Sequence, residues 1–179
     1  MNLAKKNLKL KVDNRIFIKV IKPNEVTKSY VQWLKDYEVT KYTDQNKYSH
    51  SLASTKSYVS QKFNSENDLL FGIFFDNFHI GNIKLGPIDF ENKSSEISYF
   101  IGEKSFWGQG IVSKCIKTLT QFAIIDLGMI KIIAGYYENN IGSAKALDKC
   151  GFVFEKIKVG DAIFEDKPIN NILVAYTLK

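Results

Sequence analysis

Two glycines separated by one residue precede an amphipathic segment of the chain. Gly108 and Gly110 lie between an apolar, strand-like run and residues 112–123, whose apolar side chains recur at helical spacing. Glycine allows a backbone to approach a ligand closely. The first N–H groups of a helix have no partner within the helix and lie at the positive end of its dipole. The pattern therefore indicates either a tight turn or a site for a phosphate or pyrophosphate group.

The residue types around this turn exclude several other kinds of site. A dinucleotide-binding fingerprint needs glycine where the chain has Ser113, and the Gly-Lys-Ser/Thr ending of a triphosphate-binding loop is absent. Two cysteines, Cys115 and Cys150, and two histidines are too few for a disulfide framework or for a cysteine-rich or histidine-rich metal site. We therefore expect no metal and a reducing, cytoplasmic setting.

The positive charge of the chain is confined to its first residues. The sequence has 179 residues, the usual size of one domain, and a formal net charge of +6. Residues 1–22 contain seven basic side chains and one acid, so residues 23–179 carry 18 of each sign. No apolar run is long enough to span a membrane, and the basic start lacks the apolar core of a secretory signal. We expect one domain over residues 1–179, with no nucleic-acid and no membrane partner.

Hydrophobic periodicity predicts the elements that position the glycine turn. Alternating or dense apolar residues predict strands, and amphipathic spacing predicts helices. The predicted strands span residues 8–12, 16–20, 69–75, 79–88, 96–101, 130–137, 152–159 and 169–178, and the predicted helices 25–37, 54–63, 112–123 and 143–149. The strand–helix–strand order of the second half predicts an α/β (α+β) domain with a mixed sheet.

A second motif follows the strand predicted at residues 130–137. Asn140 and Ser143 have the spacing Asn-x-x-Ser, and Gly151-Phe152 ends the next helix. Together with the segment Trp107 to Gly110, this motif resembles the GNAT (Gcn5-related) N-acetyltransferase superfamily and its RimJ/RimL-type branch. The loop of that superfamily is Gln/Arg-x-x-Gly-x-Gly/Ala, and Val112 in its last position is a departure from the pattern.

The resemblance implies both a fold and a cofactor. The implied GNAT fold has a mixed, mostly antiparallel sheet with helices on both faces and a V-shaped cleft between two parallel strands. The implied cofactor is acetyl-CoA, with its pantetheine arm along one strand and its pyrophosphate on the glycine turn. The residues implied to bind it are Tyr99, Phe100, Ile101, Trp107, Gly108, Gln109, Gly110, Ile111, Val112, Ser113, Asn140 and Ser143.

The implied reaction is direct transfer of acetyl from the thioester to a primary amine. It needs a base for the amine, a donor for the oxyanion and a donor for the departing thiolate. We expect Glu96 to be the base, with a solvated strand-end carboxylate as the alternative. Many family members have a tyrosine as acid seven residues after the motif asparagine, where this chain has Leu147. Tyr136 or Tyr137 would replace it, and a packing role is the alternative for each.

The first half of the chain is expected to build the acceptor pocket. Residues 30–42 and 79–88 resemble PseH-like enzymes, which acetylate nucleotide-linked amino sugars. Asn82 and Lys84 share one strand face, which would suit a sugar hydroxyl or phosphate. Trp33 would stack on a sugar or base, or belong to the core.

Other acceptors and other functions stay open at this point. A protein N-terminus or a small amine would favour acidic residues, which Asp36, Glu38 and Asp44 could provide. A non-catalytic acyl-CoA-binding module is a further alternative, because Leu147 cannot donate a proton. A homodimer, if one forms, would use an edge strand.

Overall fold

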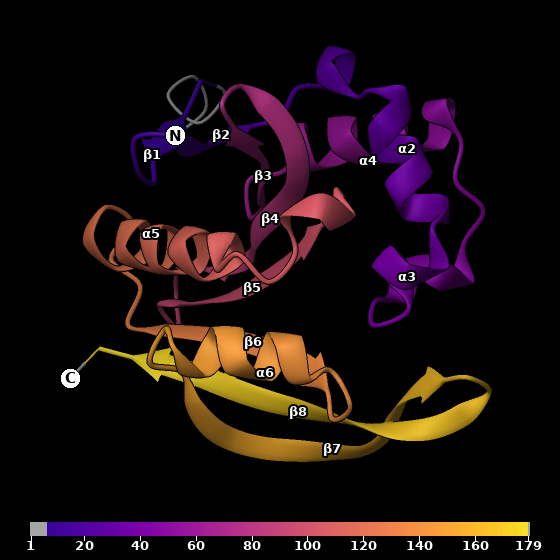
Figure 1. Cartoon of the computed structure of the whole chain (residues 1–179). Coiled ribbons are helices and arrows are strands. Elements are labelled where there is room, and N and C mark those ends of the chain that lie inside the picture. Colours follow the sequence, from indigo (N-terminus) through magenta and orange to yellow (C-terminus); the bar gives the residue numbers. More distant parts are fainter. Residues whose placement is uncertain (1–6, 179) are drawn as a thin grey trace.

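The strands of this protein form a single sheet in the order β1-β2-β3-β4-β5-β6-β8-β7 (Figure 1). The structure, a computed structural model, describes residues 7–178. The strands are β1 (Lys9–Lys11), β2 (Ile16–Val20), β3 (Leu69–Phe75), β4 (Phe78–Asp89), β5 (Ser94–Ile101), β6 (Lys131–Tyr137), β7 (Val153–Phe164) and β8 (Lys167–Thr177). The helices are η1 (Pro23–Glu25), α2 (Lys28–Lys35), α3 (Tyr37–Thr40), η2 (Asp44–Lys47), α4 (Leu52–Asn64), η3 (Lys104–Phe106), α5 (Ile111–Ile125) and α6 (Ile141–Asp148).

Within residues 7–178, one pair of neighbouring strands is parallel and the other pairs are antiparallel. The parallel pair is β5 with β6, and α5 makes the crossover that a parallel connection requires. The chain then returns through α6 and the hairpin β7–β8, with β8 inserted between β6 and β7. The predicted mixed, mostly antiparallel sheet is therefore confirmed.

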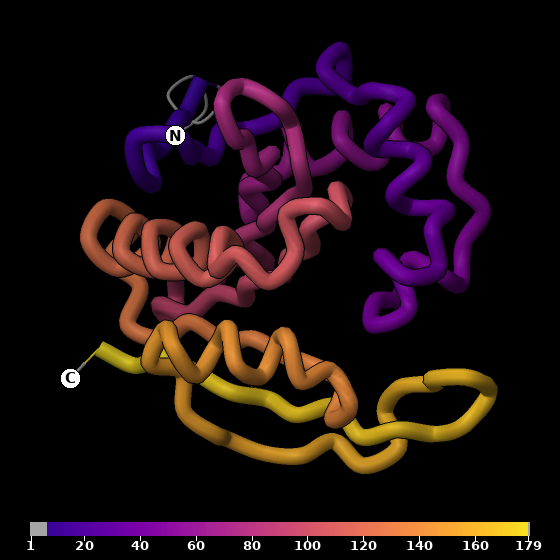
Figure 2. Tube along the Cα trace, in the orientation of Figure 1, coloured from indigo at the N-terminus to yellow at the C-terminus, as the bar shows by residue number. Residues whose placement is uncertain are grey.

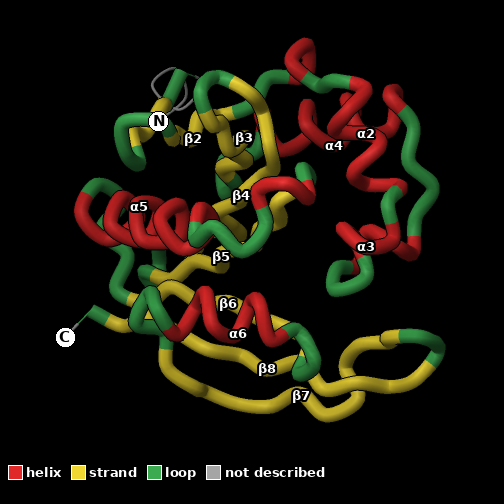
Figure 3. The backbone as a smooth tube through the Cα atoms, in the orientation of Figure 1, coloured by secondary structure: helices red, strands yellow, loops and turns green. Residues whose placement is uncertain are grey.

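Helices cover both faces of the sheet because successive side chains of a strand point to opposite faces, and apolar side chains occur on both faces. In β3, Phe71 joins a core cluster with Ile116 and Leu119 of α5, whereas its neighbour Leu70 joins a second cluster with Tyr30 of α2. Thus α5 and α6 lie on one face and α2 and α4 on the other, as Figure 3 shows for α5 and α6 side by side. We refer below to these two sides as the α5/α6 face and the α2/α4 face.

Two elements differ from the sequence-based prediction. The helix predicted at 25–37 is broken, because Asp36 has an extended backbone and its side chain accepts the N–H of Glu38 as the cap of α3. The strand predicted at 152–159 continues as β7 to Phe164, because a register shift between Lys158 and Ala162 lets the pairing with β8 resume at Ala162. The resulting hairpin extends toward the segment after α3 (Figure 2).

The basic start of the chain is partly neutralised by ion pairs. Arg15 pairs with Asp76, and Lys19 pairs with Glu25. Lys5 and Lys6 lie outside the described residues. No helix within residues 7–178 has both the length and the apolar character needed to cross a membrane.

Candidate active site

The parallel strands β5 and β6 are paired only over their first four residues. Pairing begins at Ser94 with Lys131 and ends at Ile97 with Ala134. Beyond this point β5 stays paired with β4 as far as Ile101, and β6 stays paired with β8 as far as its last residue. The two strands therefore diverge, and the backbone groups that face each other across the gap have no strand partner. An extended ligand can pair with such groups like an added strand.

The glycine turn lies at the start of α5 and is open on its outer side. Gly108 and Gly110 have left-handed backbones, with φ of 73° and 72°. Gly110 is the N-cap of α5, so no side chain caps the first N–H groups of this helix. Apart from the glycine itself and its two chain neighbours, no protein atom lies within 4 Å of the position that a Cβ would take at either glycine. The turn thus has both the free donors and the space that a pyrophosphate group needs.

Two side chains fix this turn relative to the diverging strand. The indole N–H of Trp107 donates to the carbonyl oxygen of Ile101, the last residue of β5, at 2.8 Å. The amide of Gln109 donates to the carbonyl oxygen of Ser105 at 2.8 Å. Trp107 therefore links the turn to the end of the strand expected to hold the pantetheine arm.

The next residues of α5 anchor the helix. Ile111 is buried and Val112 packs against the same core cluster. The carbonyl oxygen of Ser113 accepts the S–H of Cys150 at 3.2 Å. Lys114 pairs with Asp13 at 2.7 Å, and its hydrogen bond lowers the pKa of Asp13 to about 2. Lys114 is thus already engaged by a carboxylate.

The second motif forms the start of α6. The side-chain oxygen of Asn140 accepts the N–H of Ser143 at 3.1 Å and caps the helix. The hydroxyl of Ser143 lies 2.7 Å from the hydroxyl of Tyr99, which comes from β5. These contacts join the start of α6 to β5 beyond the point where β5 and β6 separate. The Tyr99–Ser143 contact has no signal in the sequence, because 44 positions separate the two residues.

Glu96 lies in the paired part of β5, opposite Ile133. Its side chain is exposed and points to the α2/α4 face, as do those of Ser98 and Phe100 two and four residues later. Among the described residues its carboxylate has no hydrogen-bond or ion-pair partner, and its charge acts on the nearby Lys84. A carboxylate free of partners, one residue before β5 and β6 separate, can accept a proton from an amine or a water.

The two tyrosines proposed as acids point in opposite directions, since they are neighbours in a strand. Tyr136 packs on the α5/α6 face. Tyr137 is buried on the α2/α4 face, where burial and then the charge of Asp44 raise its pKa. Leu147, at the usual acid position, is 1% exposed and belongs to the core.

Two of the three predicted acceptor residues are buried. Trp33 is 5% exposed, its indole N–H donates to Glu103 at 3.0 Å, and its ring covers Gly102. Trp33 is therefore a core residue, and its ring offers no face for a sugar. Asn82 is 2% exposed, and its oxygen lies 3.1 Å from Nε2 of His79. Its side chain is therefore not available at the protein surface for an acceptor.

Lys84 is the third predicted acceptor residue and differs from the other two. Its ammonium lies 3.8 Å from Asp68 and makes no hydrogen bond within the part of the chain described. Burial lowers the pKa of this lysine. Lys84 is therefore a partly buried cation with unused donors on the face that carries Glu96.

The acids predicted to favour a cationic acceptor are already paired. Their partners are Lys104 for Asp36, Lys41 for Glu38 and Lys47 for Asp44. Each pair places a lysine at the carboxylate, so none of these acids presents an uncompensated negative charge.

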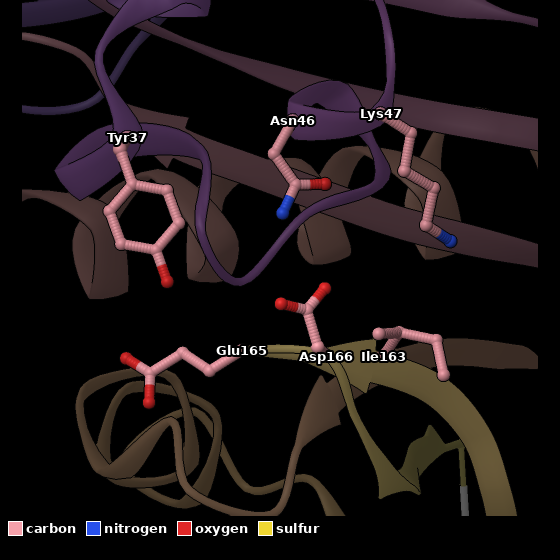
Figure 4. Close-up of a pocket in the computed structure, with 6 residues that line it drawn as sticks. All are labelled: Tyr37, Asn46, Lys47, Ile163, Glu165 and Asp166. Carbon is pink, nitrogen blue, oxygen red and sulfur yellow. The ribbon is translucent and has the colours of Figure 1, made fainter.

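A cleft of about 460 Å³ separates α3 and η2 from the tip of the β7–β8 hairpin (Figure 4). It is lined by Tyr37, Asn46, Lys47, Ile163, Glu165 and Asp166. Glu165 and Asp166 form the hairpin turn, with φ of 48° and 61°, and neither has a hydrogen-bond or ion-pair partner among residues 7–178. Phe164 stacks on Tyr42 with ring centroids 5.3 Å apart, which fixes the hairpin tip to the segment after α3. The sequence-based reading missed this cleft, because its two walls are far apart in the chain.

Comparisons with known proteins give one consistent result. A family model described as an acetyltransferase (GNAT) domain matches residues 15–153. The probable N-acetyltransferase YjcK of Bacillus subtilis (strain 168) is 25% identical over 175 residues, which cover 95% of this chain and 88% of YjcK.

Solved structures share the fold at lower identity. The ribosomal L7/L12 alpha-N-protein acetyltransferase RimL, in complex with coenzyme A, has a TM-score of 0.87 at 17% identity, with 96% of this chain and 98% of RimL covered. The microcin C7 self immunity acetyltransferase MccE, in complex with acetyl-CoA and AMP, has a TM-score of 0.80 at 19% identity, with 94% and 95% covered. RimJ of Mycobacterium smegmatis has a TM-score of 0.79 at 18% identity, with 90% and 81% covered.

Proposed function

Because the chain belongs to the GNAT family and is an acetyl-CoA-dependent N-acetyltransferase, we propose that it transfers acetyl directly to the amine of a nucleotide-linked amino sugar. One observation carries the site assignment: β5 and β6 diverge after Ile97 beside an uncapped glycine turn. The N–H groups at residues 108–113 would hold the pyrophosphate, whereas the N–H of Trp107 already donates to the carbonyl oxygen of Lys104. The free edge of β5 over residues 99–101 would pair with the pantetheine arm.

The residues of this chain would then act on the acceptor amine. Bound acetyl-CoA supplies an acyl carbon that an amine can attack. Glu96 takes the proton of the incoming amine, directly or through a water. A backbone N–H of β5 beyond Ile97, on the side that faces the gap to β6, donates to the oxyanion that develops. The departing sulfur needs a further donor, which Leu147 cannot provide.

Lys84 supports an acceptor with an anionic group. It is a cation with unused hydrogen-bond donors near Glu96, on the face that the acceptor would approach. A phosphate of a sugar nucleotide is the kind of group that such an ammonium binds as a point charge. Neither Trp33 nor Asn82 supports this acceptor, because both are buried.

A protein N-terminus is the second candidate acceptor, and a different observation favours it. Glu165 and Asp166 offer two unpaired carboxylates across the cleft from α3 and η2 (Figure 4). Such carboxylates would attract a cationic chain end rather than a phosphate. The amino-sugar candidate therefore depends on the positive charge of Lys84, and the N-terminus candidate depends on the negative charges of Glu165 and Asp166.

Coenzyme A release with two acceptors would separate these candidates. The assay compares a uridine-diphosphate amino sugar with a peptide that has a free N-terminus, using the wild type, Lys84→Met and the double variant Glu165→Gln/Asp166→Asn. With a sugar nucleotide, Lys84→Met should raise KM about tenfold and the hairpin variant should not. The exposed Lys28→Met is the control for loss of one positive charge. Turnover of the peptide alone, lost in the hairpin variant, would refute the amino-sugar proposal. Coenzyme A binding without turnover of any amine would favour a non-catalytic binding module.

The cellular location and the oligomeric state belong to the same proposal. We propose a cytoplasmic enzyme, and any homodimer would pair through β7, which is one of the two edge strands of the sheet, β1 being the other. Phe154 and Val159 in this strand are 62% and 84% exposed. Sedimentation of the wild type and Phe154→Arg tests this. If both proteins have the mass of a monomer, a β7 dimer is excluded.

A further inference from the structure

The mechanism leaves the departing sulfur without a hydrogen-bond donor. Leu147 occupies the position of the usual acid, lies in the core, and has no polar atom in its side chain. Ser143 precedes it by one helical turn on α6, so the two residues share a side of this helix. A replacement donor is therefore to be sought near Ser143. This inference rests on the proposed acetyl transfer.

Tyr99 brings a hydroxyl to this place from the opposite strand. It lies in β5 two residues beyond Ile97, where pairing with β6 ends. Its hydroxyl is 2.7 Å from that of Ser143, so the contact joins β5 to the first turn of α6. The side chain of Tyr99 packs against the core, and Asn140 fixes the backbone of Ser143. Both hydroxyls are thus held in place where the two strands diverge.

The chemistry of the two groups sets the direction of this hydrogen bond. A phenol is a stronger donor and a weaker acceptor than an aliphatic hydroxyl, which favours Tyr99 as the donor and Ser143 as the acceptor in this contact. Burial raises the pKa of Tyr99 to about 12, so this donor keeps its proton at neutral pH. The thiol of Cys150, which lies nearby, donates to Ser113 and does not compete for the Ser143 oxygen. The proton of Ser143 then remains free for another acceptor.

We infer that Tyr99 is a positioning residue. It directs the hydroxyl of Ser143 at the departing sulfur, and Ser143 thereby replaces the donor that Leu147 cannot provide. As the new carbon–nitrogen bond is completed, the carbon–sulfur bond breaks and its electron pair goes to sulfur. Ser143 donates a hydrogen bond to that sulfur and keeps its own proton. The proton that sulfur finally takes is one that the acceptor nitrogen lost to Glu96, passed on through water. Acetyl and one proton are thereby exchanged between nitrogen and sulfur, and no other reactant is needed.

The pKa of the coenzyme A thiol bound to the enzyme tests this inference without any acceptor. Thiolate absorbance in the ultraviolet is titrated in the wild type, Tyr99→Phe, Ser143→Ala and the double variant. A donor to the thiolate lowers the thiol pKa, so each single variant should raise it by about one unit. The double variant should raise it no further, because the two hydroxyls act in series. Tyr176→Phe, which removes a hydroxyl from the same face of the sheet, should leave it unchanged.

Kinetics gives a second readout. Tyr99→Phe should lower kcat about tenfold while the KM of the acceptor stays constant. Thermal unfolding of each variant shows whether it is folded. An unchanged thiol pKa in folded Tyr99→Phe would overturn the inference, even if kcat fell. Failure of every tested acceptor would overturn the acceptor proposal instead, because the thiol titration uses coenzyme A alone.

Discussion

Replacing Gly110 by alanine should separate the contribution of the glycine turn to the stability of the fold from its contribution to coenzyme A binding. Gly110 at the start of α5 and Gly128 after its end have nearly the same backbone, with φ of 72° and 70°. Apart from the glycine itself and its two chain neighbours, no protein atom lies within 4 Å of the Cβ position at either residue. A left-handed alanine costs about 1–2 kcal/mol, and the loss of unfolded-state freedom returns about 0.4–1 kcal/mol. Each variant should therefore lose about 1 kcal/mol, or about 2–4 °C in Tm.

Coenzyme A should distinguish these two variants. In Gly110→Ala the new methyl group stands on the open side of the turn, and relief of its strain would turn the first N–H groups of α5 away from the pyrophosphate. Ligand at about 100 times Kd stabilises a protein by about 2.7 kcal/mol, so the wild type and Gly128→Ala should both gain several degrees in Tm. Gly110→Ala should gain little. Thermal unfolding with and without coenzyme A measures this, and equal gains in the two variants would refute the assignment of the turn.

Three further predictions concern the base, the turn and the N-terminal ion pair. Glu96→Gln should lower kcat/KM by about 10²–10⁴; an unchanged kcat/KM would exclude Glu96 as the base. Trp107→Phe loses the hydrogen bond to Ile101, worth about 1 kcal/mol, so calorimetry should show about fivefold weaker coenzyme A binding, and equal affinity would contradict this role. The pKa of Asp13 falls from 3.8 to about 2 beside Lys114, so this pair stabilises the fold above about pH 4 and the stabilisation is lost as pH falls toward 2. Denaturant unfolding of Asp13→Asn should therefore differ from the wild type at pH 6 and converge with it near pH 2; a constant difference would argue against the linkage.

Local patterns in the sequence predicted much of the architecture. The amphipathic spacing at 112–123 corresponds to α5, and the alternation at 96–101 corresponds to most of β5, because both depend on which side of one element faces the core. Predictions failed where a capping side chain or a bulge decided the outcome. Asp36 ends one helix and caps the next, and the shift after Lys158 lengthens β7.

The acceptor side was the least predictable from the sequence. Trp33 was open to two interpretations, stacking on a ligand or packing in the core, and only the partners at Gly102 and Glu103 decide between them. No residue pattern in the sequence indicates that Asp36, Glu38 and Asp44 each pair with a lysine. Side-chain burial and ion pairing depend on neighbours in space, which one amphipathic pattern does not specify.

By itself, the sequence determined the order of the elements, the uncapped glycine turn and the likeness to a family of acetyltransferases. Only the tertiary structure decided that β5 and β6 separate after Ile97, and that Tyr99 reaches Ser143 across 44 positions of the chain. The reason is physical. Periodicity and turn residues act over a few neighbouring positions, whereas strand register and hydrogen bonds between elements depend on how the whole sheet is assembled.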